Sequence, residues 1–263
     1  MSLIRCEPSR NDYREIVGPD HADLKYIHLG LLNLSVGASW NTDFTGIESL
    51  LVILGGQCDI QAGNREWRNL GERVNVFDGK PTAVYLPPDT ECRVIGCTDM
   101  QLAVCSAVAD AGPEVTLITP DMIDVRTVGR GPFERTIYDV FQPESSEAQR
   151  LIVGETFNAP GRWSSYPPHK HDLHNPPEES DLEEVYYFRL NPPNGFGVQR
   201  VYADDFDEIY TLKDGDVITI PRGYHPLAAA PGYELYYLWT LAGEHRIMHP
   251  CEDPTHAWVG SQV

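Results

Sequence analysis

The chain alternates short apolar runs with glycine- and proline-containing turns along its whole length. The runs are rich in valine, isoleucine, leucine, tyrosine and threonine, which favour β-strands bounded by turns. No long stretch keeps the 3.6-residue period of an amphipathic helix, so the pattern predicts an all-β sandwich or barrel. The runs we expect to be strands are Leu50–Leu54, Ala83–Leu86, Leu102–Cys105, Thr136–Phe141, Val185–Leu190, Val198–Tyr202, Val217–Ile220 and Leu235–Leu241.

Two short segments carry helix signals. The first is NDYREIV, which begins at Asn11. The second is DPTHAWV, in which Asp253 can cap a helix and Pro254 falls in its first turn. We therefore expect few and short helices in an otherwise β-rich fold.

The two halves of the chain repeat one order of features. Each half has a Gly–Trp turn, then an acidic residue that opens an apolar strand, then an apolar strand that ends in proline. The instances are Gly37–Trp40, Glu48 and Val84–Pro87 in the first half, and Gly161–Trp163, Glu184 and Ile218–Pro221 in the second. The repeat predicts two similar β-barrels. The turn-prone segment ADAGPE lies between them, which divides the chain into residues 1–112 and 113–263.

Composition narrows the class of protein. The formal net charge of −19 argues against nucleic acid and anionic membranes as partners. No apolar run approaches the roughly 20 residues of a membrane span, and the first residues do not resemble a secretory signal. None of the six cysteines forms a CxxC pair, which fits reduced thiols in the cytosol. We expect a soluble cytoplasmic protein.

A candidate metal site begins with the sequence Pro-Pro-His169-Lys-His171. Residues two apart on an extended strand point to the same face, so these two imidazoles are placed side by side. A lone HxH motif is a weak signal of metal binding.

Two further residues make the signal more specific. Glu184 opens the strand Glu-Val-Tyr-Tyr-Phe, and His225 follows a Pro-x-Gly turn that begins at Pro221. The order HxH, Glu, Gly, PxG, His is similar to the two cupin motifs. The 12 residues between His171 and Glu184 exceed the usual spacing and predict an inserted loop. Three imidazoles and one carboxylate suit Zn, Mn, Fe or Co.

The insertion also offers less favoured ligands. Its carboxylates are expected to form a solvated acidic run, with Glu183 as the rival of Glu184; they are Glu178, Glu179, Asp181 and Glu183. His174 is expected to be a solvated loop residue. The first half has no HxH motif and has Glu91 where His225 stands in the second. We therefore expect an N-terminal barrel that is metal-free and structural.

The sequence resembles one enzyme family over essentially its whole length. The runs GRWSSYPPHKHD, LEEVYYFR, IPRGYHP and DPTHAWV are similar to the 5-deoxy-glucuronate isomerases of myo-inositol catabolism, relatives of the 5-keto-4-deoxyuronate isomerases. The resemblance implies a bicupin fold, a bacterial cytoplasmic homo-oligomer and metal ligands at His169, His171, Glu184 and His225. It implies conversion of 5-deoxy-D-glucuronate to 5-dehydro-2-deoxy-D-gluconate. We expect one divalent metal per chain, zinc first and manganese or iron as alternatives.

An aldose–ketose isomerisation needs a general base that reaches C2 and a cation for the substrate's carboxylate. Tyr186, on the Glu184 face, and Tyr224, beside His225, are the catalytic candidates; Glu183 and a metal-bound hydroxide are alternatives. Arg222 and Arg162 lie nearest in sequence to the ligands and are the candidates for the carboxylate.

Two other functions use the same ligands. A metal-dependent cupin dioxygenase would bind oxygen at the open position of the metal and would need O₂. A non-catalytic sugar-acid-binding bicupin would bind its ligand without turnover. The ligand set alone does not separate these from an isomerase.

Overall fold

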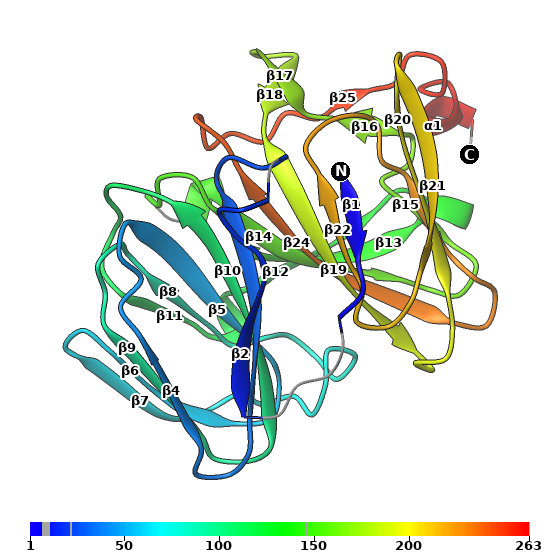
Figure 1. Cartoon of the computed structure of the whole chain (residues 1–263). Helices are drawn as coiled ribbons and strands as arrows, with labels where there is room; N and C mark the ends of the chain where they lie inside the picture. Colours follow the sequence, from blue (N-terminus) through cyan, green and yellow to red (C-terminus); the bar gives the residue numbers. More distant parts are fainter. Residues whose placement is uncertain (7–10, 22, 146, 263) are drawn as a thin grey trace. The chain divides into compact units, whose positions relative to one another are not determined.

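The structure is a computed structural model that describes residues 1–6, 11–21, 23–145 and 147–262. Strands dominate the described residues, as Figure 1 shows. The helical segments are α1 (Val259–Gln262) and the 3₁₀ turns η1 (Pro120–Met122), η2 (Gly131–Phe133) and η3 (Pro143–Ser145). The predicted all-β fold is confirmed. Within the described ranges, no helix has the length and apolar character needed to cross a membrane.

The chain forms two compact units, and each is discontinuous in sequence. The C-terminal unit comprises Met1–Cys6, Val125–Asp139 and Gly154–Val263. The N-terminal unit comprises Glu7–Asp124 and Val140–Val153. The domain boundary placed after residue 112 stays a prediction.

The C-terminal unit is built on a seven-stranded sheet. Its strand order is β1 (Ser2–Ile4), β22 (Val217–Ile220), β19 (Glu183–Asn191), β24 (Glu234–Ala242), β14 (Ile152–Asn158), β13 (Arg135–Phe141) and β12 (Asp124–Val128). A second sheet has the order β15 (Trp163–Ser164), β23 (Leu227–Ala229), β20 (Gly197–Ala203) and β21 (Phe206–Leu212). Two small ladders pair β16 (His169–Lys170) with β25 (Cys251–Glu252), and β17 (Asp172–Asn175) with β18 (Glu179–Asp181).

The N-terminal unit has a six-stranded and a four-stranded sheet. The first has the order β11 (Thr116–Ile118), β8 (Ala83–Leu86), β5 (Ile47–Gly55), β10 (Met100–Val108), β3 (Ile27–Leu34) and β2 (Asp12–Val17). The second has the order β4 (Ser39–Thr42), β9 (Cys92–Gly96), β6 (Cys58–Ala62) and β7 (Arg65–Leu70). Its apolar core includes the buried residues Leu51, Ile53, Ile60 and Val94.

The two units repeat one strand order. The run β8-β5-β10-β3-β2 matches β22-β19-β24-β14-β13, and β4-β9-β6-β7 matches β15-β23-β20-β21. The repeat inferred from the sequence therefore corresponds to a repeat of topology, in which each half builds the same pair of sheets.

The structure shifts the correspondence between the two halves by one residue from the one that the sequence features suggested. Ser49 of β5 pairs with Leu86, the residue before the strand-ending proline, whereas Glu184 of β19 pairs with Ile220 at the same place. Ser49 is thus the counterpart of Glu184. In the N-terminal unit a hydroxyl takes this position, and it hydrogen-bonds Ser106 at 2.8 Å.

Glu48, the acidic residue that the sequence features matched to Glu184, has a structural role. It is fully buried and accepts backbone N–H groups of Gln149, Arg150 and Leu151 at 2.7–3.0 Å. It also accepts the Tyr85 hydroxyl at 2.8 Å. These donors compensate the burial of the carboxylate.

All eight predicted strands are confirmed, but the helix predicted from Asn11 is wrong. The segment forms β2, which pairs antiparallel with β3. Tyr13 stacks on Trp40 with ring centroids 4.9 Å apart, so pairing and packing outweigh local helix propensity. At the other segment, Asp253 caps a turn by accepting the Thr255 N–H at 2.8 Å, while α1 begins only at Val259.

Candidate metal centre

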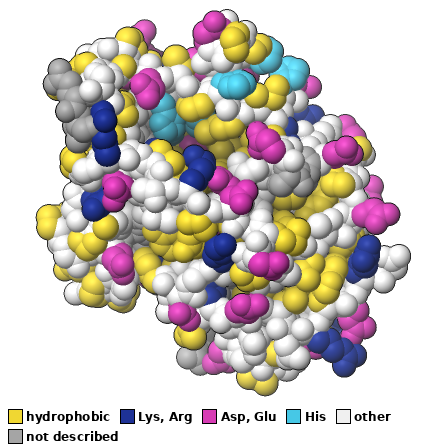
Figure 2. Space-filling model, turned by 180° about the vertical axis from the view of Figure 1, so that it is seen from behind, with side chains coloured by type: hydrophobic (Ala, Val, Ile, Leu, Met, Phe, Trp, Pro, Cys, Tyr) yellow, Lys and Arg dark blue, Asp and Glu magenta, His cyan; other side chains and the backbone are white. Residues whose placement is uncertain are grey.

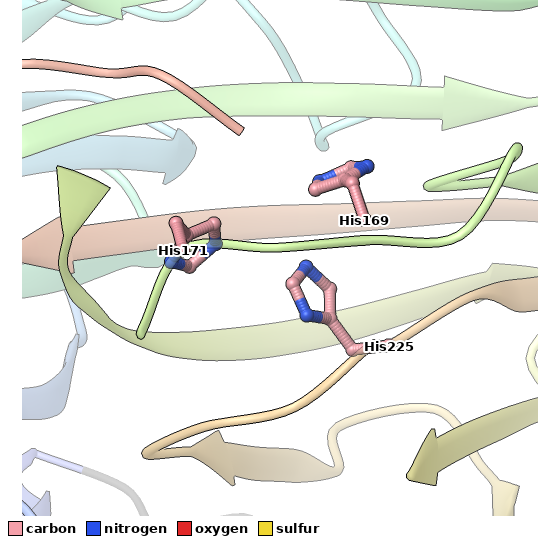
Figure 3. A group of neighbouring side chains, drawn as sticks. All are labelled: His169, His171 and His225. Atoms are coloured by element: carbon pink, nitrogen blue, oxygen red, sulfur yellow. The ribbon is translucent and has the colours of Figure 1, made fainter. Parts of the chain in front are cut away.

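Three histidines from two segments converge inside the C-terminal unit. His169 and His171 come from β16 and the residue after it, and His225 from the turn after β22. One nitrogen of each ring lies within 4.8 Å of one nitrogen of the other two. Figure 3 shows the rings facing one another. The geometry confirms that the HxH spacing places both rings on one face.

Glu184 adds a carboxylate to this group. Its Oε2 lies 3.3 Å from Nε2 of His171 and 3.4 Å from Nε2 of His225. Glu184 is the second residue of β19, and its side chain is buried. Of the two rival glutamates, Glu184 therefore contacts the histidines.

Backbone carbonyls fix the orientation of two rings. Nδ1 of His171 lies 2.8 Å from the Leu182 carbonyl, and Nδ1 of His225 lies 2.8 Å from the Gly223 carbonyl. A carbonyl only accepts, so each Nδ1 carries the proton and each Nε2 presents a lone pair. Gly223 has φ +95°, and an added Cβ would lie 2.8 Å from the Tyr202 carbonyl oxygen, so this turn requires glycine.

The inward-facing atoms are acceptors without a donor. Nε2 of His225 is buried and has no hydrogen-bond partner. In this tautomer, Nε2 of His171 faces the Glu184 carboxylate, which also accepts. Such a convergence of lone pairs is costly unless a cation or a proton lies between them. Two nitrogens from fixed rings, a third from His169 and a carboxylate oxygen fit a divalent metal of the zinc type.

The protonation states agree with that fit. Burial, with the neighbouring rings His225 and His171, holds the pKa of His169 well below its usual value. Burial also lowers the pKa of His225 to about 4. Both rings are therefore neutral at pH 7, which is the form that binds metals. Burial opposes protonation of His171 too, but its hydrogen bond to Glu184 raises its pKa. Without a metal, this raised pKa favours a proton on Nε2, between the ring and the carboxylate. A bound metal would displace that proton.

The inserted loop forms a hairpin, β17–β18, and one expectation for it is wrong. Glu179 is buried rather than solvated, and accepts the Lys170 ammonium at 2.7 Å and the Asp172 N–H at 2.9 Å. His174 is exposed, as expected, with its ring 4.3 Å from that of His245. Figure 2 shows histidine side chains gathered in the upper part of the molecule, where Figure 1 places β16, β17, β18 and β25.

Comparison with known proteins identifies the family. The KduI/IolB family model matches residues 5–259. A 5-deoxy-glucuronate isomerase of Geobacillus thermodenitrificans is 43% identical over 246 residues, which cover 92% of this chain and 89% of that protein. One from Bacillus licheniformis is 36% identical and covers 98% of this chain and 99% of that protein. The chain belongs to the KduI/IolB family. It is an isomerase, as these relatives are.

Solved structures establish the fold. An IolB-like protein from Salmonella typhimurium has a TM-score of 0.94 and 35% identity, with 98% of both chains covered. An oxalate decarboxylase of Bacillus subtilis has a TM-score of 0.62 at 11% identity, over 91% of this chain and 74% of that chain, and shows the fold alone. The fold is therefore the two-cupin fold that the motifs predicted.

The two candidate catalytic tyrosines lie in different surroundings. Tyr186 is buried on the Glu184 face of β19, with its ring centroid 6.1 Å from that of His225. Burial, then the charge of Glu184, raises its pKa well above the usual value. The Tyr224 ring lies 5.2 Å from that of Tyr202. Tyr224 is half-buried and directly precedes His225.

The two candidate arginines are engaged in ion pairs. Arg222 donates to both carboxylate oxygens of Asp205 at 2.9 and 2.7 Å, and its guanidinium lies over the Phe206 ring. Arg162 pairs with Glu134. Their proposed contact with substrate stays a prediction, and each would have to exchange its present carboxylate partner for that of the substrate.

Sequence reasoning missed Arg135, which lies on β13. Its Nη1 donates to the carbonyls of Phe133 at 3.2 Å and Tyr166 at 3.4 Å. Tyr166 lies three residues before His169, which brings β13 beside the histidine segment. No local signal could have found Arg135, because 33 residues separate it from His169.

Proposed function

We propose that this enzyme converts 5-deoxy-D-glucuronate to 5-dehydro-2-deoxy-D-gluconate, in the catabolism of myo-inositol. Relatives named 5-deoxy-glucuronate isomerase cover nearly the whole chain, which supports the substrate. The convergence of three imidazoles and the Glu184 carboxylate is the observation that carries the chemistry. We also propose a cytoplasmic homo-oligomer, with an N-terminal barrel that serves packing and assembly.

The proposed metal ligands are His169, His171, Glu184 and His225. A divalent ion held there, zinc first or else manganese or iron, would act as a Lewis acid and stabilise the negative charge of an enediolate. His169 is only partly buried, whereas His171 and His225 are buried, so substrate would approach on the His169 side.

In this proposal Tyr186 holds a proton at the reacting atoms. Its raised pKa keeps the hydroxyl protonated at neutral pH, so it acts as a hydrogen-bond donor and proton source rather than as a base. The Ser165 hydroxyl lies 3.4 Å from it. The isomerisation removes a proton from C2 and delivers one to C1, while the hydroxyl proton of C2 moves to the new hydroxyl at C1. Tyr224 stays a second candidate for proton transfer.

The first test combines metal analysis with turnover. Purified wild-type protein should contain about one divalent ion per chain. It should convert 5-deoxy-D-glucuronate with or without O₂, and incorporate solvent deuterium into the product when this is followed by NMR in D₂O. A chelator should abolish turnover, and adding back one metal should restore it.

A double variant tests the ligands. His169→Ala/His171→Ala should lose both the metal and turnover. His174→Ala/His245→Ala is the matched control, because it removes two neighbouring histidines that are exposed and lie outside the trio, and it should keep both. The metal assignment fails if the first variant retains full metal and activity. A strict need for O₂ would instead support a dioxygenase, and binding without deuterium incorporation would support a non-catalytic protein.

A further inference from the structure

Arg135 differs from most arginines of the C-terminal unit in its partners. Six others each pair with a carboxylate: Arg5 with Asp216, Arg126 with Asp139, Arg162 with Glu134, Arg189 with Asp214, Arg200 with Asp207, and Arg222 with Asp205. Within the described residues, Arg135 has no carboxylate at ion-pair distance and donates only to two carbonyls. An unneutralised, half-buried guanidinium is unusual in a chain of net charge −19.

The free edge of Arg135 has the shape that a carboxylate needs. Both carbonyl contacts use Nη1. Nε and Nη2 make no hydrogen bond to any described residue, and together they form the edge of a guanidinium that binds a carboxylate through two parallel bonds.

The surroundings of Arg135 place it at the candidate centre. Its Nη1 donates to the carbonyl of Tyr166 at 3.4 Å, three residues before His169, and its charge also acts on Tyr237. The ring centroids of Tyr237 and Tyr186 lie 4.6 Å apart, and those of Tyr186 and His225 lie 6.1 Å apart. Arg135 and the histidines therefore border the same aromatic group.

A second unpartnered group lies on the neighbouring strand β14. Asn158 is 2% exposed, and neither its Nδ2 nor its Oδ1 has a partner. It lies two residues from Thr156, which accepts the Trp239 Nε1–H at 3.0 Å, so both side chains are on the face of β14 turned to Trp239. A buried amide without partners can bind a ligand hydroxyl as both donor and acceptor.

We propose that Arg135 binds the carboxylate of the sugar acid through its Nε–Nη2 edge, and that Asn158 binds a hydroxyl of the same molecule. This inference rests on the proposed function for the identity of the substrate. It assigns the carboxylate to a residue of β13, instead of Arg222 and Arg162, whose guanidinium groups are already neutralised.

The unmodified protein provides the first test. Metal-loaded wild-type protein should bind D-glucuronate about 10- to 100-fold more tightly than D-glucuronamide in calorimetry, because only the acid forms a charge-assisted pair. Equal affinities would overturn the proposal without requiring any variant to fold.

Variants then identify the residue. Arg135→Gln should raise KM for the sugar acid about 10- to 100-fold, with a smaller change in kcat, and should leave the affinity for D-glucuronamide unchanged. Arg135→Lys should recover part of the loss. Arg126→Gln, on the adjacent strand β12 with an exposed ion pair, is the matched control and should behave like wild type. A merely structural role would instead lower metal content and weaken acid and amide equally.

The two proposals can fail separately. If wild type prefers D-glucuronate to the amide and loses this preference in Arg135→Gln, but does not turn over 5-deoxy-D-glucuronate, the carboxylate subsite stands and the proposed function falls. If turnover is present but Arg135→Gln has an unchanged KM, the function stands and the subsite is refuted.

Discussion

At the scale of the residue, the centre depends on polar groups that face away from it. Lys170 lies between the two histidines of the HxH motif and binds Asp172 and Glu179. Asp172 Oδ2 accepts the Gly223 N–H at 2.7 Å, which connects the HxH segment to the turn that carries His225. The two ligand segments are therefore held together by a hydrogen bond outside the proposed ligand set.

The charge on Asp172 should give stability that depends on pH. Burial opposes its ionisation, but the hydrogen bonds from Lys170 and the Gly223 N–H lower its pKa below the usual value. A lowered pKa contributes stability above the unfolded-state value of about 3.9, and this is lost as pH falls through the folded-state value. Asp172→Asn should therefore lower the free energy of unfolding in urea by about 1–3 kcal/mol at pH 7. The difference in unfolding free energy between wild type and variant should shrink below pH 4.

Asp205→Asn is the control for this measurement. Asp205 is exposed and pairs with Arg222, so its loss should leave unfolding nearly unchanged. A gap for Asp172→Asn that stayed constant from pH 7 to pH 3 would show that the carboxylate charge is not responsible.

At the scale of the element, strand alternation selects the residues of the site. On β19, Glu184, Tyr186 and Phe188 share one face, while Arg189 on the other face donates to Asp214 at 2.9 Å. A slip of one residue would turn Glu184 away from the histidines and bring Glu183 toward them. The pairing of Glu184 with Leu241 and Ile220 on both neighbouring strands fixes this register.

The packing of β14 leaves no room for one additional methyl group at Gly154. A Cβ added at Gly154 would lie 2.0 Å from the Trp239 ring, so Gly154→Ala should destabilise the protein by about 1–3 kcal/mol through overpacking. Trp239→Phe removes the second ring of the indole and should relieve the clash. In a double-mutant cycle followed by urea unfolding, the two changes should therefore couple favourably. Additive effects would place the cost of alanine elsewhere.

At the scale of the whole molecule, each unit is assembled from separated pieces of chain. The first residues belong to the C-terminal unit, because β1 pairs with β22. The Ser2 N–H donates to the Thr219 hydroxyl at 2.9 Å, and Arg5 pairs with the buried Asp216. The strand that leads to the His225 turn thus has the N-terminal segment as its neighbour.

Removal of residues 1–6 should therefore destabilise the C-terminal unit. It exposes one edge of β22 and leaves the Asp216 carboxylate without its arginine, which should cost about 1–3 kcal/mol for the unpaired group alone. The free energy of unfolding in urea and the metal content should both be lower than in the full chain. Arg5→Ala separates the ion pair from the strand and should have the smaller effect. A truncated protein of unchanged stability and metal content would contradict this role of β1.

The sequence by itself determined the features that arise from nearest neighbours along the chain. Runs of β-branched and aromatic residues gave all eight expected strands, and the two-residue period placed His169 and His171 on one face. The tertiary structure alone decided what depends on distant partners. It made NDYREIV a strand by pairing it with β3, buried Glu179 against Lys170, and shifted the repeat so that Ser49 matches Glu184. It also placed Arg135, without a neutralising carboxylate, near a histidine 34 positions away. Whether a charge is paired depends on the residues that the fold brings next to it, and the local sequence pattern does not specify those residues.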